Sequence, residues 1–136
     1  AGLHVAREGL TAMQRKLDLI REILLAVEAY QPSDISKLQV ITPKDFAGTE
    51  AENYHHIKML INAGLIEVAG RPTMQGQFAI HGMTMAGHDF LDAIRDKTVW
   101  EHTKKRLRDA GGWTLDLVLA VAREEVKRRL FGPGTS

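Results

Sequence analysis

The stretch Thr49–Val68, TEAENYHHIKMLINAGLIEV, decides the fold of this chain. Thr49 stands three residues before Glu52, the spacing at which a threonine hydroxyl and a glutamate together cap the first turn of a helix. Apolar residues then recur at helical spacing as far as Gly64, a residue type that readily adopts the left-handed conformation found at helix ends. The apolar residues of 65–68 begin a strand. The stretch therefore predicts a helix over about 50–63 and a strand directly after it.

Upstream of this stretch, the pattern predicts a helix, a strand and a short helix. The first helix is expected over roughly 15–29, from an apolar stripe at helical spacing: Leu17, Ile20, Leu24 and Val27. A short strand is expected over 38–41, and Thr42 before Pro43 predicts a very short capped helix that ends near 47. Residues 1–12 have weak periodicity and are expected to be an upstream extension or a cloning remnant.

Downstream, the pattern predicts a hairpin and three helices. A turn-rich loop at 70–76 leads to a return strand around Phe78 and Ile80. Thr84 is expected to cap a helix that reaches residue 96, where the apolar phase slips. The spacing of Thr98 and Glu101 then predicts a capped helix over 99–110, and Thr114 begins a last helix that ends near 130.

Composition limits the classes of function. The chain has 136 residues, with 44% hydrophobic and 26% charged residues, which is typical of one soluble globular domain. It has no cysteine, which excludes disulfides, thiolate metal sites and cysteine nucleophiles and suits a reducing cytoplasm. No apolar run approaches the roughly 18 residues that a membrane span needs. We therefore expect a cytoplasmic protein with no membrane association.

Two motifs resemble winged helix-turn-helix proteins. The segment His56–Ile66, HIKMLINAGLI, is similar to the HLxxLxxAGLI pattern at the end of their recognition helix, and Met83–Asp92, MTMAGHDFLD, is similar to the LTxxGxxxLD pattern after their wing. The resemblance implies a mainly α fold with a small β hairpin (α+β). It implies a winged-helix domain over 13–96 and a C-terminal helical extension over 97–136, packed on the same domain.

Three longer segments resemble one family more closely. MQRKLDLIREILLAVE, YHHIKMLINAGLIE and GHDFLDAIRDKTVWE are similar to a family of small bacterial and phage-borne proteins, domain of unknown function 2513, over residues 13 to about 131. That family implies the winged-helix fold and an origin in mobile elements, and it brings no established activity.

In a winged helix, the helix at 50–63 would meet the major groove of DNA. If Tyr54, Ile57, Leu60 and Ile61 are buried, the opposite face carries the candidate DNA-binding residues: Glu52, His55, His56, Lys58, Met59 and Asn62. The loop at 70–76 and the residue after it would form the wing, with its own candidates: Arg71, Thr73, Gln75 and Gln77. Imidazole and amide groups can hydrogen-bond base edges, whereas a glutamate repels phosphate.

The charge distribution leaves two functions open. Residues 1–96 have a net charge of −3 and residues 97–136 a net charge of +4, whereas DNA-binding proteins more often place positive charge on the surface that meets phosphate. The leading expectation is a winged-helix DNA-binding protein, a transcriptional regulator or accessory protein of mobile-element origin that binds double-stranded DNA. The alternative is a winged-helix protein–protein interaction module that does not bind DNA.

The C-terminal helices carry a cationic run and many apolar residues. The cations Lys104 to Arg108 and Lys127 to Arg129 complement helix dipoles, and they can also contact DNA flanks or an acidic partner. The apolar residues exceed what a helical hairpin can hide, which predicts a homodimer through five of them: Trp100, Leu107, Trp113, Leu119 and Val126. A strictly monomeric mass in solution would contradict the dimer.

No pattern predicts catalysis or a metal site. The six histidines lack a metal-ligand spacing, and the adjacent His55 and His56 point about 100° apart on a helix. His88 and Asp89 form no more than a sequence pair, because an aspartate at a helix start is favoured by the dipole alone. We expect no catalytic residue, no metal and no cofactor.

Overall fold

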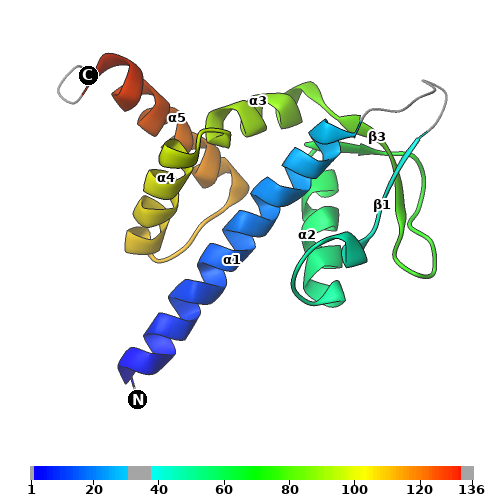
Figure 1. Ribbon diagram of the computed structural model, residues 1–136, viewed down its shortest axis with the longest axis horizontal. Coiled ribbons are helices and arrows are strands. Elements are labelled where there is room, and N and C mark those ends of the chain that lie inside the picture. The colour runs from blue at the N-terminus through cyan, green and yellow to red at the C-terminus, as the bar shows by residue number, and fades with distance from the viewer. Residues whose placement is uncertain (1, 31–37, 133–136) are drawn as a thin grey trace. The chain divides into compact units, whose positions relative to one another are not determined.

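The computed structural model describes residues 2–30 and 38–132, and of residues 2–11 only the backbone. This part of the chain contains five α-helices, one 3-10 helix and three strands (Figure 1): α1 Gly2–Ala29, β1 Gln39–Ile41, η1 Pro43–Asp45, α2 Glu50–Asn62, β2 Ile66–Val68, β3 Phe78–Met83, α3 Met85–Ile94, α4 Lys97–Ala110 and α5 Leu115–Phe131. The expected mainly helical fold with a small β component is confirmed.

The chain divides into two compact units. The sheet unit comprises residues 19–91, and the helical unit comprises residues 1–18 and 92–136. The first part of α1 therefore belongs to the helical unit and its last part to the sheet unit. Each unit is described by itself below.

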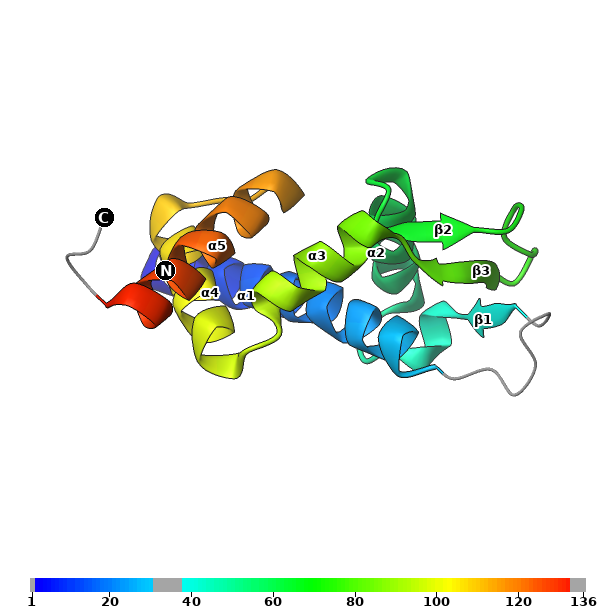
Figure 2. The same cartoon turned by 90° about the horizontal axis from the view of Figure 1, so that it is seen from above.

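The sheet unit contains an antiparallel sheet of strand order β1-β3-β2, and Figure 2 shows the three strands side by side. Ile41 is opposite Phe78 in the β1–β3 pair, and Ile66 is opposite Met83 in the β2–β3 pair. All three strands are short, so the sheet needs apolar cover to be stable. Buried residues of the sheet and of the last part of α1 and α2 supply that core: Ile20, Ile23, Leu24, Ile41, Ile57, Leu60, Ile66, Phe78 and Ile80.

Threonine caps position α2, as the sequence predicts. The Thr49 hydroxyl accepts a hydrogen bond from the backbone N–H of Glu52 at 3.2 Å. At the other end Gly64 has a φ of +78°, the left-handed conformation expected after a helix. Thr84 then ties the start of α3 to this corner, because its backbone N–H donates to the Leu65 carbonyl at 3.1 Å. Together these bonds set the direction in which α2 leaves the sheet.

Two helix starts differ from the sequence prediction. The helix α1 begins at Gly2 and not near residue 15, because Ala, Leu, Arg and Glu favour a helix even where the apolar period is weak. The expected Thr98 cap of α4 is wrong. Asp96 is the cap, and its Oδ1 accepts from the Val99 N–H at 2.9 Å, which places Thr98 inside the first turn.

The cap predicts an acid-sensitive carboxylate at Asp96. The hydrogen bond from the Val99 backbone, and then the hydrogen bond and charge of Arg129, hold the pKa of Asp96 below its ordinary value of 3.8. Because the folded-state pKa is lowered, Asp96 stabilises the folded chain at neutral pH, and this contribution is lost as the pH falls through the folded-state pKa. Carboxyl NMR titration measures this pKa. A value at or above 3.8 would contradict the assigned cap.

Candidate nucleic-acid interface

The structure sets which face of α2 meets solvent. The exposed residues include three of the predicted DNA-binding residues, His55, Lys58 and Asn62. Two further candidates, Glu52 and Met59, are half-buried at the border of this face. The residues on the opposite, buried face are Asn53, His56, Ile57 and Leu60. The exposed face is thus narrower than the sequence analysis predicts.

The prediction that His56 lies on the exposed face is wrong, because His56 is only 2% exposed. Its Nδ1 lies 2.8 Å from the carbonyl oxygen of Glu52, so Nδ1 donates and the ring lies along the helix. The neighbouring Asn53 is buried as well, and its Nδ2 donates to the carbonyl oxygens of Pro43 at 2.8 Å and Phe46 at 3.1 Å.

The hydrogen bonds of Asn53 explain why α2 turns Asn53 and His56 inward. A buried polar group costs free energy unless it is hydrogen-bonded, and Asn53 finds its partners on and after η1. Apolar periodicity predicts that asparagine and histidine are exposed. It does not reveal the carbonyl groups that stabilise a buried Asn53, because these lie ten and seven residues away in sequence. Asn53 is therefore a positioning residue that sequence analysis misses. It holds η1 against α2.

The loop between β2 and β3 forms an ordered hairpin tip. The Thr73 N–H donates to the Gln77 carbonyl at 2.8 Å, and the Gly76 N–H donates to the Thr73 carbonyl at 2.9 Å. The Thr73 hydroxyl also accepts from the Gln77 N–H at 3.1 Å. The predicted wing residues are exposed: Arg71, Thr73, Gln75 and Gln77. Met74, at the tip, is fully exposed and was not predicted.

Tyr54 joins the hairpin to α2. Its ring centroid lies 5.2 Å from that of Phe78 on β3, and a Cβ added at Gly76 would lie 3.4 Å from the Tyr54 ring. The Lys58 ammonium lies 5.8 Å from the centre of the same ring. Tyr54 belongs to α2 and packs against the hairpin, and the Lys58 ammonium lies near its ring. Lys58 is therefore on the side of α2 that adjoins the hairpin. The exposed face of α2 and the hairpin tip therefore form one surface, called the α2–hairpin surface below.

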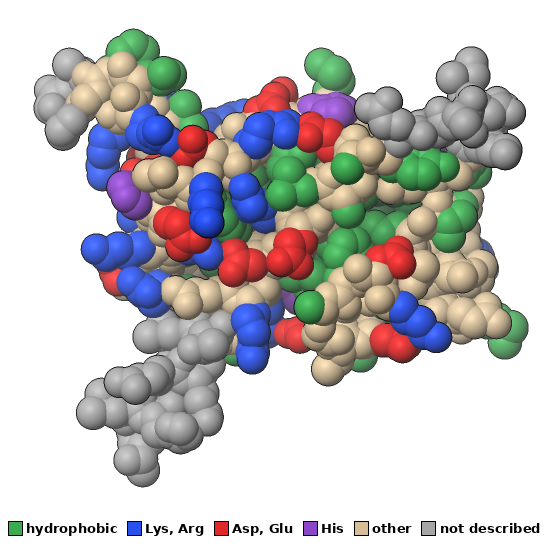
Figure 3. All heavy atoms as spheres, viewed as in Figure 1, with side chains coloured by type: hydrophobic (Ala, Val, Ile, Leu, Met, Phe, Trp, Pro, Cys, Tyr) green, Lys and Arg blue, Asp and Glu red, His purple; other side chains and the backbone are tan. Residues whose placement is uncertain are grey.

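The α2–hairpin surface is weakly charged. Its cations are Lys58 and Arg71, and Glu50 and Glu52 lie in the first turn of α2. The whole sheet unit has 5 Lys and Arg against 8 Asp and Glu, a net charge of −3, and the helical unit has 13 against 9, a net charge of +4. On the face seen in Figure 3, Lys and Arg side chains gather over α4 and α5.

The predicted dimer residues are only partly at the surface. The placement of Trp100 and Leu107 at an interface is wrong, because they are 2% and 1% exposed within this one chain. A hairpin of α4 and α5 alone would leave these side chains exposed, but α1 contributes a third helix. The Trp100 Nε1–H donates to Asp18 Oδ1 on α1 at 2.8 Å. Trp113, Leu119 and Val126 are half-buried, and the homodimer stays a prediction.

Two other structural features are absent from the described residues. No helix among residues 2–30 and 38–132 is both long enough and apolar enough to cross a membrane. Within the same residues, no three His, Asp or Glu side chains are grouped so that they could hold a metal ion.

Comparison with known proteins gives the family. The pattern of a family described as "Hypothetical protein (DUF2513)" matches residues 14–113, which excludes α5. An "Uncharacterized protein" of Haemophilus influenzae is 34% identical over 121 residues, which cover 87% of this chain and 99% of that protein. No solved structure matches this chain. The family match extends over most of the chain, and the chain therefore belongs to the DUF2513 family.

Proposed function

We propose that this chain is a winged-helix protein that binds double-stranded DNA through the α2–hairpin surface, as a transcriptional regulator or an accessory protein. The observation that carries the proposal is the joining of α2 and the hairpin tip through Tyr54. The element order α1, β1, η1, α2, β2, β3 and the strand order β1-β3-β2 support it. In this reading η1 takes the place of the helix before the recognition helix, and the β2–β3 hairpin is the wing.

The exposed residues of α2 suit the major groove. A helix fits into this groove, and residues on its exposed face reach base edges there. Asn62 can pair with adenine and His55 can hydrogen-bond a base edge, whereas Lys58 can contact guanine or phosphate. On the hairpin, Arg71 carries the charge for a phosphate or for the minor groove, and Gln75 and Gln77 add hydrogen bonds.

The acidic first turn of α2 favours the competing function, a protein-binding winged helix. Glu50 and Glu52 oppose phosphate, and Met74 offers a fully exposed apolar side chain at the tip of the hairpin. If a protein is the partner, removing a glutamate charge will not create affinity for DNA. If DNA is the partner, the neutral variant Glu52→Gln will bind more tightly than the natural chain.

Fluorescence anisotropy with a labelled random duplex of about 30 base pairs tests the proposal. We expect binding at low salt, and the double variant Lys58→Ala/Arg71→Ala should reduce the slope of log K against log salt by about 1.8, which corresponds to two lost phosphate contacts. Lys58 makes a cation–π contact with Tyr54, so far-UV circular dichroism is the check on folding.

The matched control is Arg15→Ala/Lys16→Ala, which removes two exposed charges from α1 in the helical unit. This control should keep the natural slope. Absence of binding at low salt would overturn the proposed function, and the partner of α2 would then be sought among proteins.

A further inference from the structure

Several cations of the helical unit are held by carboxylates of the same unit. Lys104 pairs with Asp18 at 2.7 Å and with Glu101 at 3.2 Å, and Arg129 pairs with Asp96. Ion pairs of this kind hold the unit together, and they use the cation's charge inside the protein. A net positive charge by itself therefore does not identify a binding surface, and the cations without an internal partner are the informative ones.

Two such cations lie on the outer face of α5. Arg123 and Lys127 are exposed and make no ion pair among the described residues. They are four residues apart, so they are neighbours on one helix face. That face is opposite the buried residues of α5: Val118, Val121, Ala122 and Glu125. No described carboxylate of the helical unit pairs with either position.

Two arginines extend this surface toward α4. Arg106 and Arg128 both contact Glu125 Oε1, through their Nη1 atoms at 3.2 and 3.4 Å, and the Glu125 side chain is only 3% exposed. The two arginine side chains remain 37% and 57% exposed. A guanidinium has five N–H donors in a rigid fork, so Arg128 keeps donors that can face solvent beside its contact with Glu125. Arg106 keeps fewer such donors, because its Nη2 also contacts Glu124.

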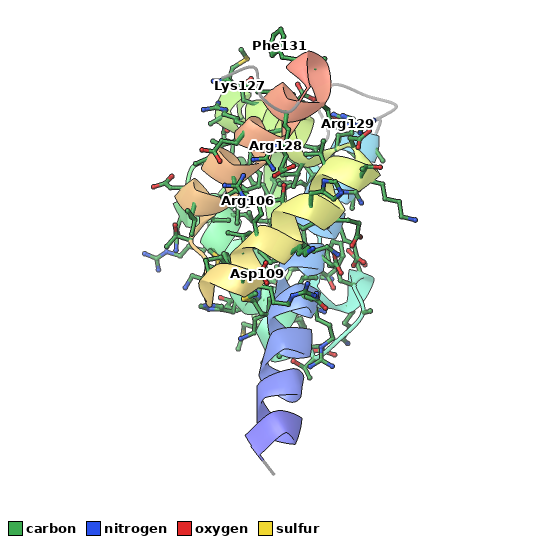
Figure 4. All side chains as sticks on the ribbon, turned by 90° about the vertical axis from the view of Figure 1, so that its left-hand side faces the viewer. Arg106, Asp109, Lys127, Arg128, Arg129 and Phe131 are labelled. Atoms are coloured by element: carbon green, nitrogen blue, oxygen red, sulfur yellow. The ribbon has the colours of Figure 1, made fainter. Side chains whose placement is uncertain are left out.

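Figure 4 shows Lys127, Arg128 and Arg106 one after another on the face of the helical unit toward the viewer, with Asp109 beyond Arg106. We call Arg106, Arg123, Lys127 and Arg128 the α5 basic surface. Its carboxylates are Glu125, which is buried beneath it, and Glu124, whose Oε2 lies 2.7 Å from Arg106 Nη2. The exposed groups are thus mainly cationic, and the buried glutamate fixes two of them in place.

We propose that the α5 basic surface binds backbone phosphates of double-stranded DNA, an inference that rests on the proposed function. Nonspecific affinity for DNA comes mainly from cations that neutralise phosphates, and the α2–hairpin surface supplies only Lys58 and Arg71. The α5 basic surface supplies the missing charge. Arginine forks match phosphate oxygens geometrically, and Lys127 adds a point charge.

The test is the full chain with Arg123→Ala/Lys127→Ala, titrated with the same labelled duplex over a range of salt. The expected result is a slope of log K against log salt that is reduced by about 1.8, with roughly tenfold or greater loss of affinity at low salt. Neither side chain forms an ion pair with a described residue, so the thermal unfolding midpoint should not change. The matched control is again Arg15→Ala/Lys16→Ala, which removes the same charge from another helix of the same unit.

The outcomes separate the two proposals. If the α5 variant keeps the natural slope while Lys58→Ala/Arg71→Ala loses part of it, the inference fails alone, and the α5 basic surface is a solvated face or meets an acidic protein. If only the α5 variant reduces the slope of log K against log salt, the inference stands and the α2–hairpin surface is not the main DNA contact. An equal response of the α1 control would assign the effect to net charge and overturn the inference. No binding by the natural chain would overturn both.

Discussion

Replacement of Gly87 by alanine should destabilise the chain by about 3 kcal/mol, the upper part of the range for overpacking. Gly87 lies in the first turn of α3, and a Cβ there would overlap the carbonyl oxygen of Leu65. It would also lie 3.1 Å from the Leu65 carbonyl carbon and 3.3 Å from Met83 Cβ. The Leu65 carbonyl accepts the Thr84 N–H at 3.1 Å, so it cannot move away without loss of that bond.

The sign of the effect makes this prediction sharp. In an unconstrained helix position, a change from glycine to alanine stabilises by about 1 kcal/mol, so the close approach to Leu65 must reverse the ordinary effect. Urea unfolding measures the difference. The control is Gly112→Ala, because a Cβ at Gly112 has no atom within 4 Å, and this variant should stay within about 0.5 kcal/mol of the natural chain. A Gly87→Ala variant of natural or higher stability would contradict the packing described here.

Replacement of Asp18 by alanine should cost about 2–3 kcal/mol, because it removes the main partner of a buried cation. The Lys104 side chain is 9% exposed, and its Nζ lies 2.7 Å from Asp18 Oδ1. The same oxygen accepts the Trp100 Nε1–H at 2.8 Å. The variant leaves Glu101, at 3.2 Å, as the carboxylate partner of the ammonium among the described residues, and it leaves the indole N–H without its acceptor.

Replacement of Lys104 by methionine should destabilise the chain less than replacement of Asp18 by alanine. Asp18 is 43% exposed in its side chain, so after Lys104→Met it still reaches water and still accepts from Trp100. Urea unfolding of both single variants and of Asp18→Ala/Lys104→Met forms a double-mutant cycle. We expect the loss of unfolding free energy in the double variant to be smaller than the sum of the two single losses. The difference should exceed about 0.5 kcal/mol, the limit for independent sites. Additive effects would show that the pair contributes nothing beyond its separate residues.

The three misplaced side chains share one physical cause. His56 was placed on the exposed face and is buried, and Trp100 and Leu107 were placed at an interface and lie inside the helical unit. Each error concerns a side chain whose surroundings come from distant parts of the chain. The partner of Trp100 is Asp18, 82 residues away in sequence, and no helical period reveals such a contact.

The α5 basic surface also depends on contacts that the sequence does not show. The sequence shows a cluster of cations near the end of the chain, but it cannot tell Arg123 and Lys127 from cations that have internal partners. Only the folded helical unit shows that Arg129 pairs with Asp96, 33 residues away. The distinction between a structural cation and a free one is therefore a tertiary property, and the predicted DNA contacts depend on it.

The sequence by itself determined the order of the helices and strands and most of their ends, apart from the starts of α1 and α4, because caps and apolar periods act over a few residues. Thr49 begins α2, and Gly64 and Gly111 take the left-handed conformation after α2 and α4. Tertiary structure alone decided which faces those elements turn inward. The free energy of burying a polar group depends on whether a distant partner meets it, as the carbonyl oxygens of Pro43 and Phe46 meet Asn53.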